Sequence, residues 1–443
     1  MNVDVKPTKT AAEQTLADTF AAVKQKLPGK GSVVALRESA FRSFDIRGLP
    51  HRRIEEWKYT DLRAAMREAK PLAAPPDAAA KARAKVAPCP IGDVECRRLT
   101  FINGVFVPEL SDLGALEKGL TIRSMAEALA KADPLVTRHL GKVVESDDAA
   151  LALNTALMGD GAFIHVAAGA MVDRPLHLAF IGPETAAAVF LRSLIVIEKG
   201  ARAMLIESHE GSQSDYQVNA ALELVVGDEA HVDHVKLISE GAQALHVSTL
   251  LGAIGAHARF NNFTFTTGGA VVRNQIFLRF GGEETVAGIR GATLLAGKQH
   301  ADTTLVIEHA SVGCQSRELF KSVLDGQSHN VFQGKIIVER GAQKTDAKMM
   351  TQALLLSERA EADNKPELEI FADDVQCGHG ATAGALDENL LFYLKSRGIP
   401  QKEAESLLIQ SFVGEAIEGI EHAGLREVLM EAVAARIMAR GRS

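Results

Sequence analysis

Cysteine, aromatic residues and long hydrophobic runs are all scarce in this sequence. The chain has 443 residues but only 4 Cys, too few for a disulfide-held scaffold. Aromatic residues make up 5%, with one Trp and three Tyr, so any core must be mostly aliphatic. No run of about 18 apolar residues is present, as a membrane-spanning helix would need, and the first twenty residues lack the apolar stretch of a secretory signal. We therefore expect a cytoplasmic protein.

A basic surplus is lacking as well. The 49 Lys and Arg are outnumbered by 56 Asp and Glu, for a formal net charge of −7. This balance argues against nucleic-acid binding and against binding to an anionic membrane. With 47% hydrophobic and 24% charged residues, the chain can bury a large core and is not disordered.

The first 149 residues divide into three segments by composition. Residues 1–70 have apolar positions at helical spacing and predict an N-terminal helical region. Residues 71–90 are rich in Ala and Pro with few large apolar side chains, which predicts a linker. Residues 91–149 predict a mixed hairpin and helix segment, in which Asn103-Gly104 is typical of a type I′ turn between two strands.

Glycine, with 37 residues, marks the architecture of residues 150–384. Short β-rich runs alternate there with glycine-centred turns, and the turn glycines lie about 28 residues apart, or about half of that. A fixed period with strands predicts a β-solenoid, in which stacked coils bury a shared core. A β-sandwich is the alternative, but hairpin dipeptides are scarce. The turn glycines are Gly169, Gly200, Gly227, Gly255, Gly282, Gly297, Gly326 and Gly341.

Residues 385–443 predict a C-terminal helical domain. After Pro400, the side chains of Leu408, Phe412 and Ala416 share one face of a helix with further apolar residues beside them. So wide an apolar stripe must pack against something substantial. A cap on the end of the solenoid would also explain it.

Cys377 and His379 form the most informative pair of potential metal ligands. Residues two apart lie on the same side of a strand, so both can reach one metal ion. Two ligands do not complete a site, so a third would come from elsewhere in the chain or from a partner. A free thiol without a metal is the alternative.

Histidine is concentrated in the predicted solenoid, with eleven of the 14 between residues 165 and 379. His231 and His234 are three apart and should point to opposite faces, so they are not a metal pair. His300 with Asp302, and Glu308 with His309, give only a weak metal signal. We expect most of these histidines to be surface or ladder residues.

Residues 365–412, KPELEIFADDVQCGHGATAGALDENLLFYLKSRGIPQKEAESLLIQSF, resemble the C-terminal core of the SufB/SufD family of iron–sulfur cluster assembly scaffolds. The segments EEWKYT at 55–60, LNTALMGDGAFIHVAAGAMVDRPLHL at 153–178 and HADTTLVIEH at 300–309 also look like the family. The departures are small: Gly378 replaces a usual Ser and Ala383 a usual Val. Chain length and the EEWKYT segment resemble the SufD type more than the SufB type.

The resemblance implies a right-handed parallel β-helix with helical N- and C-terminal regions, and a non-enzymatic scaffold. It implies pairing with SufB through the β-helix and docking of the SufC ATPase on the C-terminal helices, including Leu408, Phe412 and Ala416. Cys377 and His379 would then lie at the SufB–SufD interface, where iron or a nascent cluster forms. We expect no stably bound cofactor but transient iron or cluster; flavin binding is left open.

Two alternatives are kept. The chain could be a SufB-like subunit, or a homodimer acting without SufB. The other class is a β-helix carbohydrate-active enzyme. Such an enzyme is expected to have a secretion signal, paired carboxylates and an aromatic-lined groove. This sequence is poor in aromatic residues.

Overall fold

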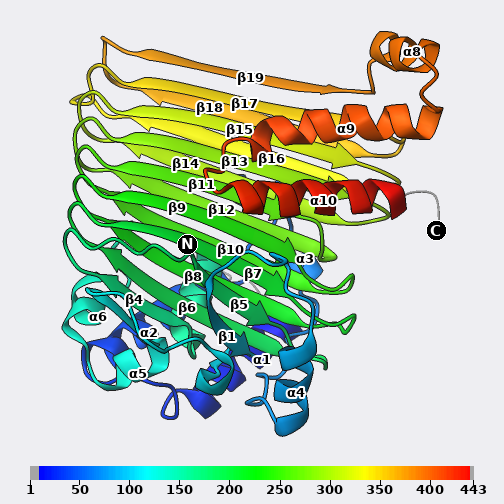
Figure 1. Cartoon of the computed structure of the whole chain (residues 1–443). Coiled ribbons are helices and arrows are strands. Elements are labelled where there is room, and N and C mark those ends of the chain that lie inside the picture. Colours follow the sequence, from blue (N-terminus) through cyan, green and yellow to red (C-terminus); the bar gives the residue numbers. More distant parts are fainter. Residues whose placement is uncertain (1–8, 440–443) are drawn as a thin grey trace, which may run out of the picture.

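The computed structural model describes residues 9–439, so the outermost residues of the predicted terminal regions, 1–8 and 440–443, lie outside the described part. Helical elements precede and follow a long stack of strands (Figure 1). The N-terminal elements are α1 (Ala11–Val23), α2 (Ser32–Arg47), η1 (Glu55–Trp57), α3 (Leu62–Ala65), α4 (Ala78–Val86), η2 (Pro108–Leu110), α5 (Met125–Ala130), α6 (Pro134–His139) and α7 (Ala149–Leu157).

The strands form two sheets that alternate along the chain, as a solenoid requires. The ten-stranded sheet contains β1 (Arg97–Ile102), β2 (Val105–Phe106), β5 (Leu176–Ile181), β7 (Arg202–Glu210), β9 (His231–Ser239), β11 (Arg259–Thr266), β13 (Val286–Leu295), β15 (Gln315–Leu324), β17 (Asp346–Leu355) and β19 (Gln376–Gly384). The nine-stranded sheet contains β3 (Leu120–Ser124), β4 (Ala162–Val166), β6 (Ala188–Ile197), β8 (Gln217–Val226), β10 (Leu245–Ile254), β12 (Val271–Phe280), β14 (His300–His309), β16 (His329–Val338) and β18 (Glu361–Ile370). The parallel β-solenoid prediction is confirmed.

Strand register gives the length of one coil. In the nine-stranded sheet residue 245 pairs with 271, 271 with 300, 300 with 329, and 329 with 361, so one coil takes 26 to 32 residues. This range contains the period of about 28 that the glycine spacing predicts. About eight turns stack in this way.

Two different physical reasons place glycine at the corners. Gly326 has a φ of +72°, a left-handed conformation that Cβ-bearing residues disfavour. Gly282 has no such φ, but a Cβ there would lie 1.9 Å from the backbone nitrogen of Ala256 in the previous coil. Positive φ therefore explains only some of these corners, and close stacking of coils explains others.

The largest hydrophobic core lies between the two sheets. Aliphatic side chains such as Leu178, Leu205 and Ile289 are fully buried in it. It also contains some of the aromatic side chains, namely Phe101, Phe180, Tyr216, Phe260, Phe280, Phe320 and Phe332.

The predicted hairpin is confirmed, whereas residues 71–90 are more ordered than a linker. β1 and β2 pair antiparallel, and Asn103 and Gly104 have φ values of +53° and +77°, as a type I′ turn requires. Residues 71–90 contain α4, whose Ala84 is buried, and the Ala73 amide donates to the Ala188 carbonyl at 2.9 Å. Backbone hydrogen bonds order this segment despite its small side chains. The exact division of the chain into domains remains a prediction.

Three helices complete the chain, namely α8 (Glu388–Ser396), α9 (Gln401–Ile417) and α10 (Ala423–Ala439). Figure 1 shows α9 and α10 lying across the ten-stranded sheet, with α8 beyond them near β19. The apolar side chains of α9 and α10 pack on outward-facing residues of that sheet, such as Val235, Phe263 and Leu294. Within residues 9–439, none of the helices combines the length and apolar composition needed to cross a bilayer.

Candidate functional site

Cys377 and His379 lie on β19, the last strand of the ten-stranded sheet. β19 pairs in parallel with β17, where Cys377 stands opposite Ala347 and His379 opposite Met349. No strand of the described chain pairs with its other edge, and Figure 1 shows β19 at the end of the stack opposite the N-terminal helices. The two residues therefore share one face of an open sheet edge.

The two side chains differ in environment. Cys377 is half-buried against the solenoid core, whereas His379 is exposed. Burial raises the pKa of the Cys377 thiol, with a further contribution from the charges of Asp346 and Glu318. The thiol is therefore protonated at neutral pH, and a metal ion would have to displace that proton in order to bind.

Glu318 is a nearby titratable residue that sequence reasoning missed. It lies on β15, opposite Met349 of β17, which in turn stands opposite His379. Neither carboxylate oxygen has a hydrogen-bond partner, and burial raises the pKa of Glu318 to about 8. Its only sequence signal is an acidic residue at an inward position, between Ser316 and Phe320 in the alternation of β15.

Residues 9–439 do not supply a third ligand beside Cys377. Two groups of three or more potential metal ligands occur in that range, His209 with Glu240 and His246, and His231 with Asp233 and Glu421. Neither includes Cys377 or His379. The predicted pair thus remains incomplete within the described chain.

The predicted docking residues of α9 are placed differently from one another. Ala416 is fully buried on the chain's own sheet, which covers its face, and its contact with a partner stays a prediction. Leu408 and Phe412 are half-buried. The Phe412 ring lies 4.5 Å from the Lys321 ammonium, a cation–π contact within the chain. The apolar stripe therefore serves first to fix α9 to the solenoid.

α8 carries the larger exposed apolar surface. None of its residues is buried, and the exposed fractions are 51% for Leu390, 74% for Phe392 and 52% for Tyr393. Leu407 at the start of α9 is also exposed. The sequence predicts α8 only as part of a helical domain, because a helical pattern does not show which face of the helix packs against a neighbour.

The EEWKYT segment has a structural role. Trp57 is buried, and its ring lies 4.4 Å from the guanidinium carbon of Arg273 on β12. Arg273 is paired with Asp302 on β14, and Thr60 bonds to both Asp302 and His300. The weak metal signal of His300 and Asp302 is therefore explained by an anchor between the N-terminal region and the solenoid.

His231 and His234 point to opposite faces, as predicted. His234 is buried and bonds to Asn262 at 2.8 Å. His231 instead lies 3.4 Å from Glu421, in the connection between α9 and α10.

Comparison with known families gives two adjoining matches. Residues 180–412 match "SUF system FeS cluster assembly, SufBD core domain", and residues 10–178 match "SufBD protein N-terminal region". Together they cover the N-terminal helices, the solenoid and the start of the C-terminal helices.

Individual relatives agree with the family matches. An iron–sulfur cluster assembly SufBD family protein of Synechocystis is 32% identical over 404 residues, which cover 88% of this chain and 87% of the relative. The iron–sulfur cluster assembly protein SufD of Escherichia coli is 31% identical over 397 residues, covering 88% and 90%. SufD of Bacillus subtilis is 28% identical over 332 residues, covering 72% and 75%.

Proposed function

This chain belongs to the SufBD family and has a role in iron–sulfur cluster assembly by the Suf system, and we propose that it serves there as a non-enzymatic scaffold subunit of the SufD type. The observation that carries the proposal is the position of Cys377 and His379 on β19, an edge strand at the open end of the solenoid. A thiol and an imidazole suit iron, and an open edge suits a partner chain.

The partner at this edge is a SufB-type subunit in our proposal. β18 and β19 end the two sheets, and Ile370 at the end of β18 and Phe371 directly after it are exposed. Pairing of a second β-solenoid here would cover these apolar side chains and satisfy the free strand edge. It would also bring ligands of another chain to Cys377 and His379, which lack a third ligand of their own. Iron or a nascent cluster is then the cargo of the shared site.

Replacing the two ligands tests this assignment. We expect Cys377→Ala and His379→Ala to restore little or no cluster assembly in cells lacking the native protein, because one remaining ligand holds iron weakly. Cys89→Ala, which removes another half-buried thiol, should restore assembly fully. Full assembly by both site variants would overturn the ligand assignment while leaving the family role intact.

The SufC ATPase docks on the C-terminal helices in this proposal, and the exposed face of α8 supports the idea. An apolar surface that the chain's own packing leaves exposed is formed by Leu390, Phe392 and Tyr393. ATP hydrolysis in SufC would move these helices and, through α9 on β13 and β15, open the partner interface.

A charge on α8 tests the docking surface. Phe392→Asp should weaken SufC binding at least about tenfold, because an aromatic side chain that the partner would bury is replaced by a carboxylate. Ile46→Asp is the matched control, since Ile46 is 80% exposed on α2 at the other end of the molecule. A pull-down and a titration measure both variants beside a chain truncated after Gly384, which should lose SufC. Equal binding by Phe392→Asp and Ile46→Asp would contradict the placement on α8.

The SufB-like alternative predicts a different composition of the purified complex. Co-purification from the native cytosol, with identification of each subunit and its stoichiometry, separates a SufD-type subunit from a SufB-type subunit or a homodimer.

A further inference from the structure

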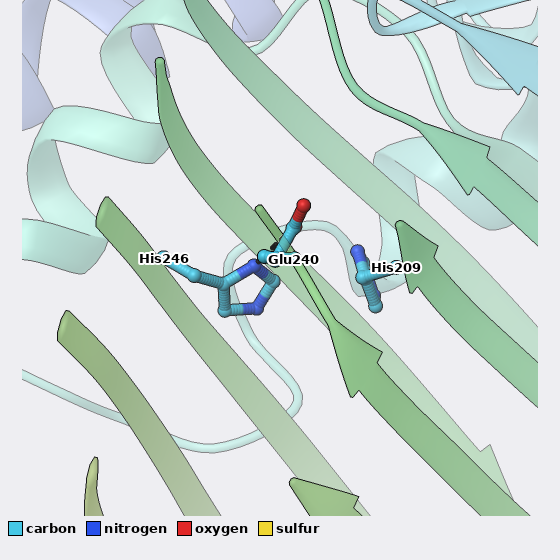
Figure 2. A group of neighbouring side chains, drawn as sticks. All are labelled: His209, Glu240 and His246. Carbon is cyan, nitrogen blue, oxygen red and sulfur yellow. Dashed lines mark hydrogen bonds and ion pairs between the residues drawn. The ribbon is translucent and has the colours of Figure 1, made fainter. Parts of the chain in front are cut away.

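A second group of potential metal ligands lies inside the solenoid, far along the chain from Cys377. His209 is on β7, His246 is on β10, and Glu240 follows the end of β9. Figure 2 shows Glu240 between the two imidazole rings. One ligand atom from each residue lies within 4.8 Å of the others, and all three side chains are buried.

The ring nitrogens of this group have unused bonding capacity. His246 donates from Nδ1 to the Glu240 carboxylate at 2.9 Å, which leaves Nε2 without a hydrogen bond. Neither ring nitrogen of His209 makes a hydrogen bond, although Nε2 lies 3.7 Å from the Glu207 carboxylate. Buried polar atoms are nearly always bonded, so three unbonded nitrogens in one place call for a ligand.

The charges around the group favour a cation. Glu207 and Glu240 are both buried, and the Tyr216 hydroxyl donates to the Glu240 carboxylate. One ammonium faces them, that of Lys236, whose Nζ lies 3.5 Å from Glu207. Two negative charges against one positive charge leave the interior with a surplus that a divalent ion would offset.

A small space lies beside two of the three residues, His209 and Glu240, and His246 does not line it. A cavity of about 10 Å³ is lined by His209, Glu240 and apolar side chains such as Phe180 and Val218. A volume of this size holds about one water molecule. It is too small for an organic ligand.

The other three-residue group also has a buried ring nitrogen without a hydrogen bond, that of His231, but its carboxylate is already engaged in ion pairs. Glu421 is already paired with Arg202 at 3.2 Å, as well as lying close to His231. The added positive charge of an arginine opposes a cation, and Glu421 ties the α9–α10 connection to the sheet. Its His231 therefore provides a matched control.

We propose that His209, Glu240 and His246 bind one divalent transition-metal ion inside the solenoid. Two imidazoles and one carboxylate are ligands typical of Fe(II) and Zn(II), whereas Mg²⁺ and Ca²⁺ prefer oxygen alone. This site is separate from Cys377 and His379, and it does not depend on the scaffold function proposed above.

Metal titration of the full chain tests the proposal. The chain carries Cys377→Ala and His379→Ala, so that metal bound at the open edge is removed from the measurement. After chelation it is incubated with Co(II) or Zn(II), freed of excess metal by gel filtration, and assayed by elemental analysis. We expect about one equivalent per chain and a Co(II) absorption spectrum without thiolate bands.

Substitution then assigns the ligands. His209→Gln, His246→Gln and Glu240→Gln should each weaken Co(II) binding by more than the 10–100-fold typical of a second-shell residue. His231→Gln should bind Co(II) like its parent. Circular dichroism and gel filtration identify variants that fold. Should the histidine variants not fold, Glu240→Gln and the Co(II) spectrum of the parent chain carry the test.

Two results would overturn the inference: less than a tenth of an equivalent of either metal bound to the parent chain, or unchanged binding by the folded variants. Neither result touches the scaffold proposal, which is judged by cluster assembly with native Cys377 and His379.

Discussion

At the scale of single residues, the solenoid interior holds ionisable groups that differ in whether neighbouring groups compensate their charge. Glu207 lies within 4 Å of Lys236, His209 and His234. Glu318, by contrast, is buried with no hydrogen bond to either oxygen. Such a carboxyl remains protonated, because the charged form would lose its hydration without gaining a partner.

The raised pKa of Glu318 predicts a pH-dependent stability. Its pKa is about 8 in the folded chain against an ordinary 4.5, so the folded state binds the proton more tightly. The stabilising contribution of protonation is complete below pH 4.5 and is lost as the pH rises through 8. We expect the free energy of unfolding to fall between pH 5 and pH 9 more steeply for the native chain than for Glu318→Gln. Urea unfolding across this range measures both, and parallel profiles would contradict the assignment.

At the scale of elements, one buried ion pair joins the N-terminal region to the solenoid. Arg273 donates to the Glu56 carbonyl at 2.6 Å, stacks on Trp57 and pairs with Asp302. Both members of the ion pair have no exposed side-chain surface. The contact between residues 55–60 and the sheet therefore depends on Asp302.

Loss of the Asp302 charge should release this anchor. Asp302→Asn leaves the Arg273 guanidinium buried without a counter-ion, which costs about 3 kcal/mol or more. Asp215→Ala is the control: Asp215 is half-exposed and its partner Lys70 also pairs with Glu68, so about 1 kcal/mol or less is expected. Urea unfolding gives the two values, and limited proteolysis should cut the N-terminal region of Asp302→Asn first. Similar losses in both variants would show that the pair does not anchor this region.

At the scale of the whole molecule, the solenoid is a stack in which each coil contacts its neighbours. Interior coils are covered on both sides, whereas the coil of β18 and β19 has a neighbour on one side within the described chain. Stability should therefore decrease toward that end. The N-terminal end is covered by the hairpin and helices that precede the solenoid.

Hydrogen exchange should report this asymmetry and its removal by a partner. Amides of β19 should exchange faster than those of β9 to β13 in the isolated chain, because one of its edges is open. Adding the proposed SufB-type partner should slow exchange at β19 and leave β9 to β13 unchanged. Protection that appears only on α8, or nowhere, would place the partner elsewhere.

Local sequence patterns were sufficient to predict several features of the fold. Asn103-Gly104 predicts a type I′ turn because both residues tolerate positive φ, and the structure has that turn. The period of about 28 residues predicts the length of one coil. Strands in parallel register return to the same corner of the solenoid once per coil. Composition did not reveal the backbone hydrogen bonds that join residues 71 and 73 to Ala188 in a segment with few large side chains.

What the sequence by itself determined is therefore whatever depends on neighbours in the chain: the repeat, the hairpin, the helices, and the pairing of Cys377 with His379 on one strand face. Tertiary structure alone decided which groups from distant coils meet. It buried Ala416 against the sheet, left Phe392 exposed, and gathered His209, Glu240 and His246 from two strands and a connection. Stacking brings residues about 30 positions apart into contact, and a local pattern does not reveal which side chains of successive coils face one another.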